Sequence, residues 1–503
     1  MHPLVLLTAV TALARMTVSD RYHPDEIRRE PISRMAPPPE RDPSYWINEA
    51  EAGIRERLRR RDNRNVARNI VMFLGDGMSV PTLAAARTLL GQRQGRRGEE
   101  AKLAFETFPT TGFSKTYCLN AQVADSACTA TAYLCGVKAN SGTVGVTGDV
   151  PRYDCDASAD PANHVDSIAV WALEDGRDAG VVTTTRVTHA SPAGVYAHVA
   201  NRHWESDEKV RDDRGDPRRC PDIAHQLVHM SPGNRLKVIL GGGRKEFLPI
   251  DEYDEEGFPG GRGDNRNLIK EWQANKQSEG VSHAYVWNKQ QLMNFSSSPP
   301  KYLLGLFKNS HMHFHLEANQ TTEPTLAEMT EIAIKSLSRN KQGFFLFVEG
   351  GRIDHAHHDN YVHLALDETI ELSNAVEVAK KLLSEEDSLI VVTADHAHVM
   401  TFNGYMERGG DILGVSDNKD KDGIPYMTLS YSNGRGARRQ LNGVRVNSET
   451  HGGDDVGVFA RGPHHDMFSG VYEQSQLPHL MAYAGCIGPG LHACGNGCDK
   501  KRP

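Results

Sequence analysis

The chain alternates between short apolar runs that end abruptly in polar residues and longer stretches with apolar residues at helical spacing. Strands whose residues are almost all apolar are typical of a parallel sheet that helices cover on both faces. Between the last two runs, residues 365–383 carry a helical apolar pattern. The sequence therefore predicts an α/β fold with a central, mostly parallel sheet. The predicted strands are Asn69–Leu74, Ala179–Thr183, Leu236–Leu240, Phe344–Val348 and Leu389–Thr393.

Acidic and histidine residues follow the carboxyl ends of three of these strands. They are Asp76, Glu349, Asp354, Asp395 and His396. In open α/β sheets, ligands bind at this edge. We therefore expect these side chains to meet in one crevice.

The residue types at this edge are metal ligands. Carboxylate and imidazole bind zinc, and the segment Asp354–His358, the pair Asp395–His396 and the separate His451 supply both. Asp76 and Glu349 add oxygen donors that suit magnesium. We favour a metal site over the alternative of a solvated cluster of loop residues.

Ser126 is surrounded by small residues and leads into an alanine-rich helical stretch. A serine at a helix N-terminus lies near backbone N–H groups that suit an anion. Taken alone, the segment fits an ordinary N-cap better, because Ser and Asp are favoured there.

Three regions lie outside the strand–helix alternation. Residues 21–68 are charged and proline-rich, and we expect an arm with a helix near 48–60. Residues 245–325 and 403–447 are expected to be insertions on the core rather than additional core strands, and 489–503 a polar tail. His311, His313 and His315 alternate as on one side of a strand, for which an exposed polar face is favoured over a metal site.

The net charge bears on possible partners, and the N-terminus indicates export. The net charge of −8 gives no sign of the basic face that a nucleic-acid partner needs. Residues 1–14 are interpreted as a signal peptide, because the apolar run Leu4–Ala14 is too short to span a bilayer. A disordered or buried N-terminal segment is the alternative. Asn294 and Asn319 head glycosylation sequons, and no hydrophobic tail of a lipid-anchor signal follows residue 489. We predict a secreted glycoprotein, with attachment to the outer cell surface through another isoform or partner as the alternative.

Eight cysteines fit an exported enzyme with a few disulfides. We favour the pairs Cys155–Cys220 and Cys486–Cys494, and Cys118–Cys128 brackets a short loop that a further bond would close. The spacing does not fix the connectivity. Cys135 lies in an apolar stretch and is expected to be a buried thiol, and Cys498 is left over.

Six segments together resemble the alkaline phosphatase family, in the order of that family. They are FLGDGM, VADSACTAT, TTTRVTHASPAGVYAHVANRHW, FVEGGRIDHAHH, TADHAH and ETHGGDDVGVFARGP. The resemblance covers about residues 69–488, which we take as the catalytic domain, and is closest to the animal branch of secreted or membrane-attached homodimers. It implies hydrolysis of small phosphate monoesters of broad range through a phosphoserine, with two zinc ions and one magnesium ion.

The resemblance also implies a role for each site residue. Ser126 is the nucleophile, Arg202 binds the phosphate and is oriented by Asp125, and His355 lies beside the site. The implied metal ligands are Asp354, His358 and His451 for one zinc, Asp76, Asp395, His396 and Ser126 for the other, and Asp76, Ser191 and Glu349 for magnesium, with His189 in its outer shell. Metal coordination activates a serine, and two metals clamp the attacking and leaving oxygens.

The chain departs from the family at a further, calcium-binding site of the animal enzymes. The equivalents are Glu252, Phe307 and Glu323, but Lys308 stands where an acid is usual. An ammonium removes a calcium ligand. We therefore expect no calcium there and a salt bridge from Lys308 to Glu252 or Glu323 instead. Ser448 is a candidate for the site entrance, although an exposed loop serine is the favoured interpretation.

Two other classes of function remain open at this stage. A phosphodiesterase or sulfatase shares the two-metal core, but a phosphodiesterase often uses Thr and a sulfatase a modified Cys or Ser. A non-catalytic surface or mineral-binding protein on the same fold would be expected to have lost the nucleophile or a ligand. The chain retains Ser126 and the whole ligand set.

Overall fold

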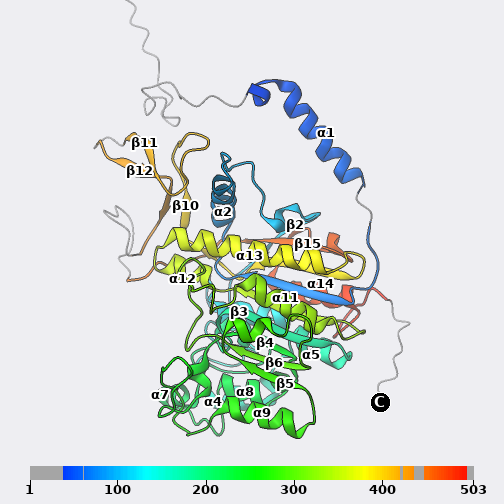
Figure 1. Cartoon of the computed structure of the whole chain (residues 1–503), viewed down its shortest axis with the longest axis vertical. Coiled ribbons are helices and arrows are strands. Elements are labelled where there is room, and N and C mark those ends of the chain that lie inside the picture. Colours follow the sequence, from blue (N-terminus) through cyan, green and yellow to red (C-terminus); the bar gives the residue numbers. More distant parts are fainter. Residues whose placement is uncertain (1–37, 60–61, 420–422, 435–446, 495–503) are drawn as a thin grey trace, which may run out of the picture.

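The computed structural model describes residues 38–59, 62–419, 423–434 and 447–494. Ten strands form one sheet in the order β16-β2-β15-β8-β1-β7-β3-β4-β6-β5 (Figure 1). Neighbouring strands run parallel except at β15, which is antiparallel to both β2 and β8. This confirms the predicted α/β class. The strands are β1 (Asn69–Gly75), β2 (Thr110–Lys115), β3 (Asp178–Arg186), β4 (Val238–Gly242), β5 (His283–Val286), β6 (Tyr302–Leu306), β7 (Phe344–Gly350), β8 (Ser388–Ala394), β15 (Val456–Arg461) and β16 (Gly470–Glu473).

Both faces of the sheet are buried, as the apolar runs predict. Ile70, Met72 and Leu74 of β1 belong to one core cluster, and Val71 and Phe73 belong to the other. This alternation follows from the two-residue period of a strand. A strand covered on both sides has no polar face, which is why its sequence is a continuous apolar run.

Helices form the two covering layers. On one face, α13 packs against α11, α12 and α2, and on the other, α5 and α14 pack on the central strands. α13 is the helix that the spacing of 365–383 predicts. Among the other helices, α4, α7, α8 and α9 lie in the region of β3–β6 (Figure 1). The bounds of the helices of this body are α2 (Val80–Arg93), α3 (Ser126–Ala130), α4 (Cys155–Ala159), α5 (Ile168–Glu174), α6 (Ala190–Ala193), α7 (Asp207–Asp212), α8 (Ile223–His229), α9 (Leu268–Ser278), α10 (Lys289–Met293), α11 (Leu326–Leu337), α12 (Arg352–His358), α13 (Val362–Leu382) and α14 (Leu477–Gly485).

α1 and the segment after β8 lie outside the ten-stranded sheet. α1 (Pro43–Arg59) projects to one side of the sheet (Figure 1), and none of its residues is buried. The segment after β8 forms β9 (Ala397–His398), which pairs with β14 (His451–Gly452), and two small ribbons. These ribbons are β10 (Met400–Phe402) with β13 (Leu429–Tyr431) and β11 (Val415–Lys419) with β12 (Pro425–Met427).

Two sequence predictions about the region 245–325 are wrong. β5 and β6 lie in this region and extend the sheet at its edge, so the region is not merely an insertion on the core. The apolar run of β6 was overlooked because the region around it is acidic, glycine-rich and histidine-rich. His311, His313 and His315 are not in a strand. Their side chains bond three different partners, which are Arg186, Glu323 and Asp367 in that order.

The described cysteines form two disulfides, Cys118–Cys128 and Cys155–Cys220. Cys135 is a buried thiol, as predicted. The predicted bond between Cys486 and Cys494 is wrong in this structure, where the backbone N–H of Cys494 points to the Cys486 sulfur at 3.1 Å. The signal peptide and Cys498 lie outside the described residues.

Candidate active site and metal centre

The candidate site lies at the carboxyl ends of three neighbouring strands. Asp76 follows β1, Glu349 is near the end of β7, and Asp395 and His396 follow β8. β1 pairs with both other strands in register, so Leu74 lies opposite Glu349 and Thr393. The topology therefore brings together residues that are hundreds of positions apart in the chain.

Ser126 is the first residue of α3, and Asp125 caps this helix by accepting from the backbone N–H groups of Ala127 and Cys128. The Ser126 hydroxyl is buried and lies 3.2 Å from Nε2 of His396 and 3.5 Å from Oδ1 of Asp76. An uncharged serine hydroxyl is thus surrounded by an imidazole and a carboxylate, both of which are metal ligands by type.

His358 and His451 face each other with their Nε2 atoms 3.0 Å apart. The Nδ1 of His358 donates to the Glu449 carbonyl, and the Nδ1 of His451 donates to the Ala124 carbonyl. In neutral rings both Nε2 atoms then carry lone pairs, which repel at this distance unless a cation lies between them. Oδ1 of Asp354 lies 3.4 Å and 3.3 Å from these two nitrogens, which completes a set of three donors.

Two further donor groups surround Asp76. Its ligand atoms lie within 4.8 Å of those of Asp354 and His396, and within 4.8 Å of those of His189 and Glu349. The Ser191 hydroxyl donates to Oδ2 of Asp76 at 3.5 Å. Asp395 joins the His396 group, because its Oδ2 lies 3.1 Å from Nε2 of His396.

These carboxylates are buried together, which is unfavourable without compensating positive charge. Burial, followed by the charges of Asp395 and Asp354, raises the pKa of Asp76 well above its usual value. Burial raises the pKa of Glu349 to about 7. Glu349 Oε1 and Asp395 Oδ2 are buried and have no hydrogen-bond partner among the described residues. Acceptors left over in this way fit divalent cations that bind oxygen and nitrogen.

Arg202 supplies the positive side chain of the site. Its Nη1 donates to Oδ2 of Asp125 at 2.9 Å, and its Nη2 donates to Nε2 of His189 at 3.3 Å. Burial works against the charged form of Arg202, but the contact with Asp125 outweighs it and raises the pKa of the guanidinium. His355 packs edge-on against His189 with ring centroids 5.5 Å apart, beside the site as expected.

One buried histidine escaped the sequence analysis. His398 donates from Nε2 to Oδ1 of Asp354 at 2.7 Å, and its Nδ1 bonds the buried Glu449. These two carboxylates overcome the effect of burial and raise the pKa of His398 to about 9. The ring also explains Gly77, where a Cβ would lie 2.4 Å from His398 and where φ is +71°. The sequence shows only that His398 follows His396 at a two-residue spacing, which does not tell a site histidine from a structural one.

The position equivalent to a calcium site holds a salt bridge. The ammonium of Lys308 lies 2.6 Å from Glu256 and 3.7 Å from Glu323. Of the two expected partners of Lys308, Glu323 is confirmed and Glu252 is wrong, because the partly exposed Glu252 pairs with Lys270 at 3.1 Å instead. Phe307 is buried in the apolar core.

An open depression of about 650 Å³ lies beside His358 and His451. Val123, Ser448 and Thr450 line it. Ser448 is solvent-exposed, as the favoured interpretation had it, and its hydroxyl donates to the His358 carbonyl at 3.0 Å. Ser448 therefore lies at the rim of the site.

The fold and the donor set define the class of protein: an α/β protein with carboxylate, imidazole and serine groups gathered at one edge of its sheet, as in a metal-dependent enzyme. The model of the alkaline phosphatase family matches residues 67–448 and 442–487. A membrane-bound alkaline phosphatase of Bombyx mori is 60% identical over 501 residues, which cover 94% of this chain and 91% of that protein. A tissue-nonspecific alkaline phosphatase of Gallus gallus is 46% identical, with 92% of each chain covered.

Among solved structures, a variant of the TAB5 alkaline phosphatase with Mg bound in its M3 site has the same fold. It matches with a TM-score of 0.63 at 21% identity and covers 84% of this chain and 99% of that one. The chain therefore belongs to the alkaline phosphatase family and is a hydrolase of phosphate monoesters. No helix in the described ranges has both the length and the apolarity needed to cross a bilayer.

Proposed function

We propose that the chain hydrolyses phosphate monoesters by attack of Ser126 on phosphorus, which releases the alcohol and leaves a phosphoserine that water then cleaves. The observation that carries this proposal is the position of the Ser126 hydroxyl, within 3.5 Å of both Asp76 and His396. A phosphodiesterase or sulfatase remains the rival, and the family assignment favours the monoester.

The metal assignment is part of the proposal. Two zinc ions and one magnesium ion, when bound, would neutralise the phosphate charge and acidify the serine and the water that bind them. The proposed ligands are Asp354, His358 and His451 for the first zinc, Asp76, Ser126, Asp395 and His396 for the second, and Asp76, Ser191, Glu349 and an outer-shell His189 for magnesium. The unpartnered oxygens of Glu349 and Asp395 support this set, and the Mg of the TAB5 variant fits it.

The protein groups hold the substrate and its proton. Arg202 offers its remaining N–H groups to phosphate oxygens, and Asp125 keeps the planar guanidinium oriented. In the neutral rings of His358 and His451 the Nε2 lone pairs point into the site, because the Nδ1 atoms donate to backbone carbonyls. The alcohol part of the substrate would lie in the open depression, which is wide enough to admit small esters of many kinds.

The proposal also covers assembly and location. We propose a homodimer in which the exposed apolar side chains of α1 contact a second copy, since Trp46, Ile54 and Leu58 are each more than half exposed. We propose an exported, glycosylated protein with two disulfides, as the cysteine usage favours. The name of the Bombyx mori relative, membrane-bound, fits the alternative of attachment to the outer cell surface.

The test compares Ser126→Ala with the parent protein on p-nitrophenyl phosphate and bis-p-nitrophenyl phosphate. We expect the parent to prefer the monoester and Ser126→Ala to lose turnover by at least about a thousandfold, as removal of a nucleophile does. Ser469→Ala, an exposed serine away from the site, is the matched control. Mass spectrometry of acid-quenched parent should find phosphate on Ser126. Unchanged turnover by Ser126→Ala, or preference for the diester, would overturn the proposal.

A further inference from the structure

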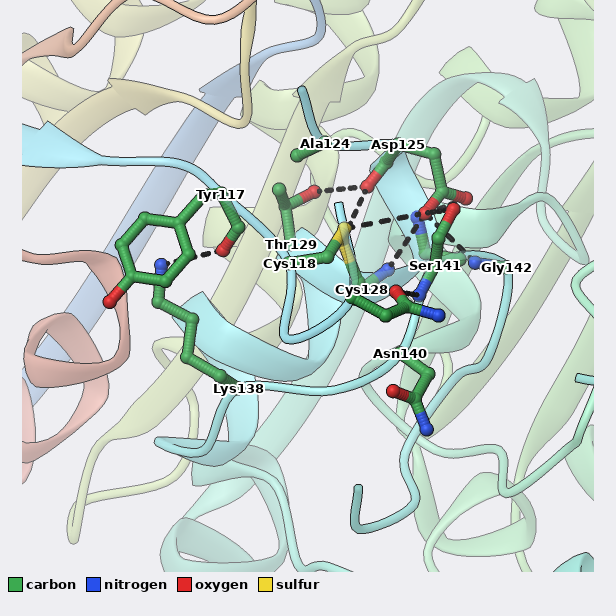
Figure 2. Close-up of a disulfide and its surroundings, with 12 residues drawn as sticks. Tyr117, Cys118, Ala124, Asp125, Cys128, Thr129, Lys138, Asn140, Ser141 and Gly142 are labelled. Atoms are coloured by element: carbon green, nitrogen blue, oxygen red, sulfur yellow. Dashed lines mark hydrogen bonds between the residues drawn. A yellow bond between two sulfur atoms is a disulfide. The ribbon is translucent and has the colours of Figure 1, made fainter. Parts of the chain in front are cut away.

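The loop that ends at Ser126 is closed by a disulfide. Cys118 and Cys128 are ten positions apart, their Cα atoms lie 5.8 Å apart, and both side chains are buried. Cys128 lies in α3, two residues after Ser126. Figure 2 shows the bond directly beneath Asp125, with the Cys118 sulfur 3.9 Å from Oδ1 of that residue.

The loop supplies two contacts to the site and leads directly into Ser126. Asp125 bonds Arg202 at 2.9 Å, and the Ala124 carbonyl accepts from His451 at 2.7 Å. Ser126 itself ends the loop. A displacement of residues 118–125 would therefore move the partner of Arg202 and the partner of His451 together.

Packing alone holds this loop weakly. Its apolar contacts form a separate small cluster of Cys118, Ala124, Cys128 and Ala139, apart from the two large core clusters. Alanine side chains bury little apolar area, so this cluster contributes little stability. Leu119 and Val123 are 54% and 45% exposed, so they add little to it.

Hydrogen bonds tie the loop to a second one. Leu119 N–H donates to the Ala139 carbonyl at 3.0 Å, and Asn120 Oδ1 accepts from Ser141 N–H at 2.8 Å. Gly142 N–H donates to Oδ1 of Asp125 at 2.9 Å, and the Gly142 carbonyl accepts from the Arg202 N–H at 2.8 Å. Figure 2 shows Ser141 and Gly142 of the second loop beside Asp125. The two loops thus hold the Asp125–Arg202 pair from both sides.

We propose that the Cys118–Cys128 disulfide is a positioning element for phosphate binding: it holds Asp125 where it orients Arg202. A covalent closure restricts the loop where apolar packing is small. Because both sulfur atoms are buried, thiols in solution have little access to the bond, and a fixed structural role follows rather than an exchangeable one. This inference rests on the proposed role of Arg202.

The test measures the inhibition constant of inorganic phosphate, Ki, with the metal-loaded full chain and p-nitrophenyl phosphate as substrate. For Cys118→Ala/Cys128→Ala we expect Ki to rise about tenfold, the size expected when a hydrogen bond to a charged group is loosened. Metal content, measured by elemental analysis, should be unchanged. The control is Cys155→Ala/Cys220→Ala, which removes the other disulfide. It should lower the melting temperature and leave Ki within about twofold of the parent, because Cys155 and Cys220 bond each other and Ser158 rather than Asp125 or Arg202.

A double-mutant cycle identifies the route. In an Arg202→Ala background, removing Cys118 and Cys128 should change Ki no further, because the group that the disulfide positions is then absent. If the double-alanine chain does not fold, Asn120→Ala loosens the same loop through an exposed residue and should raise Ki about twofold. The inference is overturned if Ki stays at the parent value in the variants of this loop that fold, or rises equally in the control. Loss of the proposed function is a separate outcome, reported by Ser126→Ala.

Discussion

Single side chains decide which ions the surface of this protein attracts. At the position of the animal calcium site, the Lys308 ammonium contacts Glu256 and Glu323, and Arg244 also contacts Glu256. Two protein cations thus occupy the surroundings of these carboxylates. A calcium ion would have to displace them and lose a ligand.

We predict that the parent protein binds no calcium at this place and that Lys308→Glu does. Saturating calcium should stabilise Lys308→Glu by about 2–3 kcal/mol, the linkage energy at a ligand concentration near a hundred times Kd. The measurement is the melting temperature with and without calcium. Lys270→Glu, which alters the exposed pair with Glu252, is the control and should not respond. Stoichiometric calcium in purified parent protein would contradict the prediction.

A second residue-scale effect concerns stability and pH. Glu368 is buried on α13, and burial raises its pKa to about 7, although the N–H of His315 and the charge of Arg352 oppose this. A carboxyl with a raised folded-state pKa favours folding while protonated. That contribution is complete below the unfolded pKa of 4.5 and is lost as the pH rises through about 7.

Glu368→Gln keeps the acceptor for His315 but carries no charge. Relative to the parent, we expect it to gain on the order of 2 kcal/mol in unfolding free energy at pH 8.5 and much less at pH 5. Denaturant midpoints at the two pH values measure the difference. Equal effects of the substitution at both values would refute the assignment to this carboxyl.

At the scale of elements, the sequence predicts best where burial is complete. β1, β3, β4, β7 and β8 were found because a strand covered on both faces is a continuous apolar run. β5 was missed because its first three residues are only half-buried, so its pattern is mixed. The metal ligands were found from residue type at strand ends together with the family resemblance. His398 was missed because only the tertiary fold sets which of neighbouring histidines contacts Asp354.

α1 leaves several large apolar side chains in solvent. Trp46, Ile54 and Leu58 are spaced so that they share one face, and they are 54%, 54% and 80% exposed. Each side chain that becomes buried against a second copy would contribute about 1.5–3 kcal/mol.

We therefore predict that Ile54→Lys/Leu58→Glu weakens the proposed homodimer at least tenfold, or about 1.4 kcal/mol. Analytical ultracentrifugation over a concentration series gives the dissociation constant. Ala52→Lys, on the opposite face of the helix, should leave the dissociation constant unchanged. A monomeric parent, or a double variant as dimeric as the parent, would show that α1 does not form the contact.

At the scale of the whole molecule, the site links distant parts of the chain through charge. Its donors extend from Asp76 to His451 and come from α3, α6, β7, α12, β14 and the segments after β1, β3 and β8. Without cations, the buried carboxylates of Asp76, Asp354 and Asp395 repel each other at this edge of the sheet. Removal of metal should consequently loosen the fold as well as abolish activity.

The size of this effect should depend on pH. In the metal-free protein, the pKa of Glu349 is raised to about 7, mainly by burial, so protonation relieves the repulsion at pH 6. Its stabilising contribution is lost as the pH rises through 7. We expect the difference in melting temperature between metal-loaded and chelated protein to widen from pH 6 to pH 8.5. The corresponding loss of unfolding free energy in the chelated protein is on the order of 2–3 kcal/mol.

Calorimetry before and after chelation, with metal content checked by elemental analysis, measures that difference, and zinc plus magnesium should restore the melting temperature. Glu349→Gln supplies the internal control, because its chelated form has no carboxyl to lose a proton at this position and should vary less between the two pH values. A gap that is equal or narrower at pH 8.5 would mean that Glu349 does not set the charge balance of the empty site. The buried carboxylates would then be held apart by the fold itself, and the cations would be needed for chemistry alone.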